Sequence, residues 1–356
     1  MNCMENLKRS QIPNEIVMKY IRVYKSIGIN RYNHDTLVGD YEVMVRQTVR
    51  NDTYYFAKIF QVNVTDARFK SLIYKNVKPK NKDEKLIINL KNAFTKIHNE
   101  TTSFELLVTE VQDLLKFLYN DIITTNKMQF RKIERKDRNV NLLNSKYSST
   151  RESIEYLIQL FKDAIEENSY EPSYIITNFY IDFIKIKPFV DKNEEIGILL
   201  MYILLITNGF EVFEYISFME KIYKAKDTFD NVVLQSTFNW EVGYAQILPL
   251  HDFIIDVSLD SYQTLNFLVR DYEYDKQLNK SNNVENTITK LDDTFSKDDI
   301  RIIHPYISDS TINRTLKRLR DEGKIRPLGK GRSAKWIKLI ELDEKKLKFE
   351  QLDLNI

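Results

Sequence analysis

Apolar residues recur at helical spacing through most of the first 276 positions, and this pattern predicts a mainly α-helical chain. A polar stretch from Ile29 to Asp40 interrupts the first segment, and a charged break at 78–86 precedes the second. Ser149 and Thr150 stand ahead of an amphipathic run, as expected of a helix start. The predicted helical segments are 14–60, 90–120, 150–165, 171–186, 193–208, 212–235 and 240–276.

The longest apolar run extends from Ile196 to Ile206 and is followed by Gly209. A membrane span needs roughly 20 apolar residues, about twice the length of this run. Gly209 stands where a glycine commonly follows the last turn of a helix. We therefore expect a helix buried inside a globular domain, and no membrane partner.

The C-terminal part has a different pattern, with short elements and turn residues. Residues 277–286 are polar and read as a linker. A helix is expected from Thr287, a second from Ser296 to Ile303, and a third from Ser308 or Ser310 to about Glu322, closed by Gly323. Two strands at 324–328 and 334–339 then flank a glycine-rich basic loop at 329–332, which is the pattern of a hairpin.

Charge is unevenly distributed along the chain. The formal net charge is only +2, yet residues 301–340 hold eleven Lys and Arg against three acidic residues, a net charge of +8. The rest of the chain then carries −6. A basic segment on a mildly acidic body is the electrostatic pattern of nucleic-acid binding.

Cysteine and histidine usage bears on compartment and cofactors. Cys3 is the single cysteine, so an internal disulfide and a cysteine-based metal cluster are excluded. The four histidines are scattered without metal-ligand spacing, and the N-terminus has no uninterrupted apolar segment of the kind a signal peptide needs. We expect a cytoplasmic protein with no cofactor.

Residues 187–198, KPFVDKNEEIGI, resemble the signature HPFxDGNGRxxR of the Fic family, which also lies between two helices. The flanking segments NFYIDFIKI and ILLMYILLITNGF have the apolar pattern of that family, and the resemblance extends over about 85–265. It implies a Fic-type helical domain. In the family, the motif histidine is a general base, the acidic residue holds Mg²⁺, the Gly-Asn-Gly turn binds phosphate and the arginines neutralise it.

The motif departs from the family pattern at the positions that carry this chemistry. Lysine replaces the base, lysine and glutamate replace the glycines, and glutamate and isoleucine replace the arginines. A protonated lysine is no base, side chains crowd a phosphate nest, and a carboxylate repels phosphate. We therefore expect no catalytic residues, and a metal only if Asp191 holds one. The retained positions are Pro188, Phe189, Asp191 and Asn193, and the replaced ones are Lys187, Lys192, Glu194, Glu195 and Ile198.

The segment 287–340 resembles the winged helix-turn-helix domains of bacteria. The resemblance implies that the helix after Ser308 enters the major groove of DNA and that the basic hairpin contacts phosphate or the minor groove. The residues expected to bind nucleic acid are Thr311, Asn313, Arg314, Lys317, Arg318, Lys330, Arg332 and Lys335.

The sequence thus predicts a Fic-type helical domain followed by a small winged-helix (α+β) domain. Its favoured function is a DNA-binding regulator on a Fic-like body that is not an enzyme. Two alternatives stay open: an interaction protein, such as a phage or mobile-element inhibitor of a bacterial defence enzyme, and an AMP transferase with a rewired site. A homodimer and a protein partner are further alternatives. The predicted divisions are 1–84 (N-terminal helical region), 85–276 (Fic-like domain), 277–286 (linker), 287–340 (winged helix) and 341–356 (tail).

Overall fold

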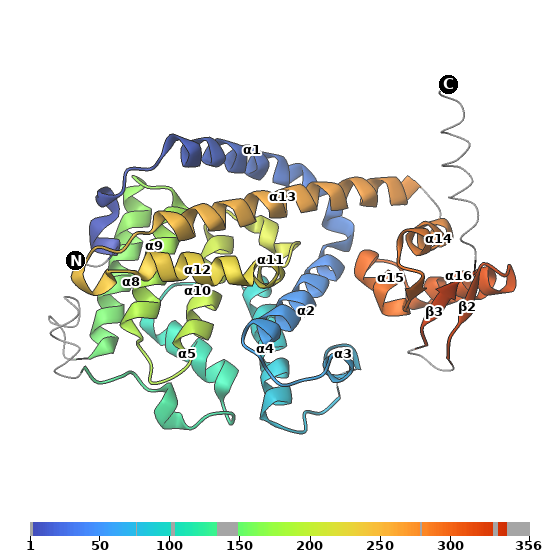
Figure 1. The fold of residues 1–356 in the computed structure, drawn as a ribbon, viewed down its shortest axis with the longest axis horizontal. Coiled ribbons are helices and arrows are strands. Elements are labelled where there is room, and N and C mark those ends of the chain that lie inside the picture. Colours follow the sequence, from blue (N-terminus) through green and yellow to red (C-terminus); the bar gives the residue numbers. More distant parts are fainter. Residues whose placement is uncertain are drawn as a thin grey trace. The chain divides into compact units, whose positions relative to one another are not determined.

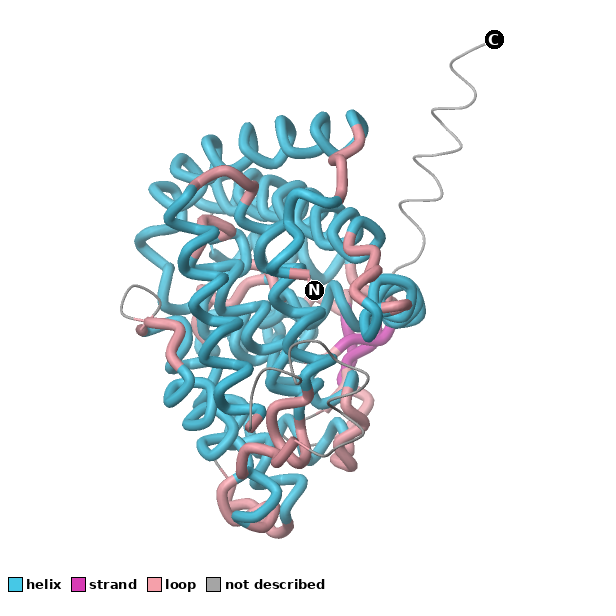
Figure 2. The backbone as a smooth tube through the Cα atoms, turned by 90° about the vertical axis from the view of Figure 1, so that its left-hand side faces the viewer, coloured by secondary structure: helices cyan, strands magenta, loops and turns pink. Residues whose placement is uncertain are grey.

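The computed structural model describes residues 3–75, 77–100, 104–133, 149–277, 280–329 and 334–339. It is mainly helical, and strands occur only near the C-terminal end of these residues (Figures 1 and 2). The chain forms two compact units. The large unit contains Met1–Asp35 and Thr48–Asn266, and the small unit contains Thr36–Gln47 and Phe267–Ile356.

The core of the large unit is a pair of buried helices, α9 (Pro172–Ile186) and α10 (Asn193–Thr207), which pack on each other. Every residue of α10 from Ile196 to Ile206 is buried, so the apolar run is the core helix that the sequence predicts. Among the described residues, no helix is both long and apolar enough to cross a membrane. Around this pair lie η1 (Met4–Arg9), α1 (Asn14–Leu37), α2 (Tyr41–Ile59), α3 (Asp66–Lys75), α4 (Lys82–Asn99), α5 (Val108–Tyr119), η4 (Thr125–Met128), α8 (Thr150–Glu167), η5 (Glu211–Glu214), α11 (Phe218–Lys224), α12 (Lys226–Thr237), η6 (Trp240–Val242) and α13 (Leu248–Gln277).

Two helix boundaries in the N-terminal part differ from the prediction. The polar stretch from Ile29 onward is not a break, because α1 continues to Leu37 and its inner face uses polar residues. Asn33 is buried there, and its amide donates a hydrogen bond to Asn266 over 2.9 Å. The charged segment before residue 86 likewise contains the first turn of α4, whose N-terminus is capped by the Asn81 side chain. The division at 84/85 therefore falls inside a helix, and residues on both sides belong to one unit.

The small unit has the order α14 (Lys280–Lys290), β1 (Thr294–Phe295), α15 (Lys297–Ile303), α16 (Asp309–Asp321), β2 (Ile325–Pro327) and β3 (Trp336–Lys338), with η2 (Val38–Asp40) joining it from the N-terminal side. Its three strands form an antiparallel sheet in the order β1-β3-β2. The predicted caps are confirmed, since Ser296 and Ser308 each accept a hydrogen bond from a backbone N–H three residues later, and Gly323 has the positive φ expected after a helix.

The predicted linker at 277–286 is wrong from Lys280 onward, because α14 begins there and packs on α16. Val284 and Ile288, four residues apart, are both buried in the core of the small unit. Asn283 and Thr287 are buried on the same helix. A helix that buries only two large apolar residues together with small polar ones has the composition of a linker, which is why the pattern hid it.

In the large unit, the buried carboxylate of Asp52 on α2 joins this helix to α10 and α11. It accepts hydrogen bonds from the Ser217 hydroxyl (2.6 Å), the Met219 N–H (2.9 Å) and the Tyr202 hydroxyl (3.1 Å). Complete burial nevertheless dominates and raises the pKa of Asp52 to about 7. The folded protein therefore holds a proton here more tightly than the unfolded chain does.

We predict that Asp52→Asn flattens the dependence of stability on pH. The raised pKa gives wild type a contribution that is complete below pH about 4 and is lost as pH rises through 7, amounting to about 4 kcal/mol. The asparagine keeps an acceptor for Ser217 and Met219 but does not titrate. Chemical denaturation between these pH values should show the variant gaining relative to wild type as pH rises, whereas Asp113→Asn, on an exposed side chain, should follow wild type. Parallel curves for Asp52→Asn and wild type would contradict this.

Candidate functional site

The predicted motif is a short loop between the C-terminal end of α9 and the N-terminal end of α10. Lys187 ends α9 with φ +49°, and Lys192 precedes α10 with φ +68°. Both residues thus adopt the left-handed conformation that glycine favours. Lys192 stands at the first glycine position of the Fic signature, so the backbone of that turn is kept although its residue type is not.

The retained residues hold the loop in place. The Asn193 side chain accepts a hydrogen bond from the Phe189 N–H (2.8 Å) and donates one to the Phe189 carbonyl (2.9 Å). The Phe189 ring is buried and lies 5.0 Å from the ring of Phe130. The Pro188 carbonyl accepts a hydrogen bond from the Thr150 hydroxyl over 2.7 Å. These contacts give the retained positions a structural role.

A segment far away in sequence lines the loop along one edge. Phe130 forms an antiparallel bridge with Phe189, the Arg131 N–H donates to the Pro188 carbonyl over 2.8 Å, and the Val190 N–H donates to the Gln129 carbonyl over 3.3 Å. The Arg131 guanidinium also donates to the carbonyls of Ile186 (3.0 Å) and Lys187 (3.1 Å). This pairing was not predicted, because Phe130 is the single apolar residue of the segment 129–131 and stands in a polar stretch.

Two of the charged replacements neutralise each other at the start of α10. Lys192 and Glu195 form an ion pair of 2.8 Å, and the Lys192 ammonium lies 5.3 Å from the centre of the Tyr119 ring. The Glu195 side chain is only 12% exposed. Burial, together with the nearby carboxylates of Glu195 and Asp191, raises the pKa of Tyr119 well above its ordinary value. The first turn of α10 therefore holds an internal carboxylate where the family motif binds phosphate.

The Asp191 carboxylate also has binding partners within the chain. Lys127 pairs with its carboxylate over 3.2 Å, and the Lys192 N–H donates to it over 2.9 Å. Burial alone would raise the pKa of Asp191, but these two interactions outweigh burial and hold it below its usual value. Within the described residues, no group of three or more His, Cys, Asp and Glu side chains is arranged to bind a metal ion.

The remaining replaced positions differ in their exposure to solvent. Lys187 and Glu194 are exposed, whereas Ile198 is 1% exposed and belongs to the core. Lysine needs a desolvated environment to act as a base, and an exposed side chain lacks one. An arginine at position 198 would have to be buried among apolar residues. The residues around the loop therefore do not fit a bound magnesium nucleotide.

The second predicted site is the exposed side of α16, where Asn313, Arg314 and Lys317 are all exposed. The opposite side is buried, with Ile312, Leu316 and Leu319 each 1% exposed, as the sequence predicts. Thr311 is half-buried beside the Ser308 cap, and Lys335 is exposed just before β3. Lys330 and Arg332 lie outside the described residues.

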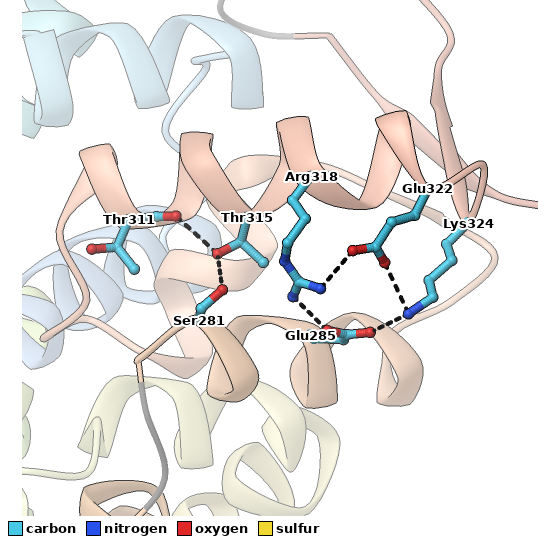
Figure 3. Close-up of polar contacts among 7 residues, drawn as sticks. All are labelled: Ser281, Glu285, Thr311, Thr315, Arg318, Glu322 and Lys324. Atoms are coloured by element: carbon cyan, nitrogen blue, oxygen red, sulfur yellow. Dashed lines mark hydrogen bonds and ion pairs between the residues drawn. The ribbon is translucent and has the colours of Figure 1, made fainter.

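Arg318 is placed differently from the other predicted DNA-binding residues. Its guanidinium pairs with Glu285 on α14 (2.5 Å) and with Glu322 (2.8 Å), and Lys324 pairs with the same two carboxylates at 2.7 and 3.0 Å (Figure 3). The network joins α14 to α16 and to the start of the hairpin. Glu285 was not among the predicted residues, because it fell in the predicted linker.

The fold and the loop define a helical protein built around a helix–loop–helix motif. Residues 112–205 match the model of the Fic/DOC family. The chain is similar in structure to a Fic family protein from Desulfovibrio desulfuricans G20 (TM-score 0.54, 13% identity, 94% of this chain and 98% of that chain covered) and to Fic-1 (aa134–508) from C. elegans (TM-score 0.53, 10% identity, 71% and 72% covered). A comparison with curated proteins found no match. Residues 112–205 therefore match the Fic/DOC family, and the chain has the fold of these Fic proteins.

We predict that Asn193→Ala lowers the free energy of unfolding by about 1–3 kcal/mol, because it leaves the N–H and carbonyl of buried Phe189 without their partner. Thermal or urea unfolding measures the change. Glu194→Ala, at the neighbouring exposed position, is the matched control and should alter stability by less than about 0.5 kcal/mol. Equal effects of the two substitutions would argue against a structural role for Asn193.

Proposed function

We propose that the chain is a DNA-binding regulator, in which a C-terminal winged helix binds DNA and the Fic domain no longer transfers nucleotides. The proposal of DNA binding rests on the exposed basic side of α16. The order helix–strand–helix–helix–strand–strand, with an antiparallel hairpin after α16, is that of a winged helix. It supports the placement of α16 in the major groove.

The residues of α16 that we assign to DNA contact are chosen by exposure and by freedom from ion pairs. Asn313, Arg314 and Lys317 project from the exposed side of α16 and can reach base edges and phosphates. Arg318 is omitted from the assigned set, because contact with phosphate would require it to leave Glu285 and Glu322. Its role in the proposal is to fix the angle of α16 on α14.

The loss of catalysis is supported by the occupied loop. A nucleotide phosphate at the start of α10 would meet the Glu195 carboxylate, and a metal at Asp191 would have to displace Lys127. Two like charges about 4 Å apart repel each other by about 1 kcal/mol in bulk water and by about 4 kcal/mol near a protein surface. The exposed Lys187 offers no base. These features weigh against an AMP transferase with a rewired site.

We predict that the protein binds duplex DNA and that Arg314→Ala/Lys317→Ala weakens this binding by about 10-fold or more. Fluorescence anisotropy at two salt concentrations measures it. Binding should fall steeply with salt, and the variant should have a shallower dependence because it makes about two fewer phosphate contacts.

The matched control is Lys116→Ala/Lys224→Ala, which removes two exposed charges from the large unit. It should bind DNA like wild type. If wild type does not bind at low salt, the regulator proposal fails, and the alternative of a protein partner is tested next by pull-down from a bacterial lysate.

We predict that wild type neither binds Mg²⁺-ATP measurably in calorimetry nor transfers labelled AMP to itself or to proteins of a lysate. The variant K187H/K192G/E194G/E195R removes the carboxylates and restores the turn, so it should bind ATP more tightly than wild type. AMP transfer by wild type that disappears in Lys187→Ala would overturn the proposed loss of catalysis.

A further inference from the structure

The outward side of α1 is an apolar stripe. Between residues 17 and 32, six large apolar side chains are 40–58% exposed. At about 100° per residue, they fall within one arc of about 140° on the helix. They are Val17, Met18, Ile21, Tyr24, Ile29 and Tyr32, and we call them the α1 stripe.

The other side of α1 is held firmly by the large unit. Lys19 pairs with Asp252 (2.6 Å) and Asp256 (2.7 Å) on α13, and the Tyr20 hydroxyl bonds to the buried His251 over 2.5 Å. Val23 is completely buried. Figure 1 shows α1 along the margin of the large unit, with α13 beside it. The helix therefore presents the stripe outward from a fixed position.

The stripe is large for a surface that stays in water. A fully exposed large side chain has an area of about 150–250 Å². With their exposed fractions, the six side chains together expose roughly 600 Å². That is at the upper end of the largest apolar patches on monomeric proteins, about 300–600 Å². A standard protein interface needs about 800 Å² from each partner, which the stripe and its polar margin approach.

We propose that the α1 stripe pairs with the same stripe of a second copy of this chain, with the two helices antiparallel about a twofold axis beside Tyr24 and Lys25. This arrangement places Ile21 opposite Gly28 of the second copy, where a Cβ would meet nothing within 4 Å. It also places Val17 opposite Tyr32 of the second copy. Each contact occurs twice, as twofold symmetry requires.

The single charge inside the stripe fits this arrangement. Lys25 comes opposite Tyr24 of the second copy, so each ammonium meets an aromatic ring and a cation–π contact forms on both sides of the axis. A parallel pairing would instead align Lys25 with Lys25 and Ile21 with Ile21. We therefore favour the antiparallel pair, because in it Ile21 faces Gly28 and Lys25 faces the Tyr24 ring of the second copy.

The oligomeric state of the full chain tests the proposal, and its outcome does not depend on DNA binding. Sedimentation velocity from about 1 to about 100 µM should show a concentration-dependent dimer. Ile21→Glu should shift the protein to monomer by placing charge in the stripe, and Gly28→Trp should do so by filling the space that Ile21 enters. Phe238→Glu alters an equally exposed apolar side chain outside α1 and should leave the dimer unchanged.

A crosslink gives the orientation. In I21C/G28C, oxidation should join two chains covalently, because positions 21 and 28 of one helix are about 10 Å apart and cannot bridge within a chain. The parent chain, whose Cys3 is buried, should stay uncrosslinked. A monomer at all concentrations, or a dimer that survives both Ile21→Glu and Gly28→Trp, would overturn the proposal. Circular dichroism confirms that each variant is folded.

Discussion

The close contact between α9 and α10 is the constraint on which the large unit depends. Gly197 lies so near α9 that a Cβ there would come within 2.8 Å of the Ile184 side chain and 3.3 Å of the Tyr180 ring. The short separation allows almost every residue of the two helices to be buried. It also fixes the ends of both helices, and with them the loop of residues 187–192. The loop geometry is thus a consequence of core packing, whatever chemistry the loop performs.

This dependence accounts for which motif positions are kept and which are replaced. Phe189 and Asn193 pack and brace the loop, so their loss would disturb the core beneath. Among the replaced positions, Lys187 and Glu194 are exposed, whereas Ile198 belongs to the core. Lys192 and Glu195 now form an ion pair across the first helical turn, and a carboxylate there interacts favourably with the helix dipole. The site is stable without an external anion because the chain supplies one.

The long helices and the small unit's core were predictable because their apolar periodicity is strong. Ile312, Leu316 and Leu319 needed only their spacing to be placed on the buried side of α16. Three features were hidden by composition: the polar inner face of α1, the polar helix α14, and the strand-like pairing of Phe130 with Phe189. In each case a contact distant in sequence decides the structure, and spacing carries no information about such contacts. The position of Arg318 was missed for the same reason, since its partner Glu285 lies 33 residues away.

Local pairing also changes what the charge count of the C-terminal segment means. A sum of +8 over residues 301–340 treats every cation alike, but Arg301 pairs with Asp298 and Asp309, and Arg318 and Lys324 share Glu285 and Glu322. Glu285 and Asp298 lie before residue 301, so their negative charges are not counted in this sum. The sum therefore overstates the positive charge that a ligand meets. Among the described residues of the segment 301–340, the exposed cations without an ion pair are Arg314, Lys317, Arg326 and Lys335. Only cations that meet phosphate release counterions, so the electrostatic strength of this surface follows from these few residues and not from the net charge.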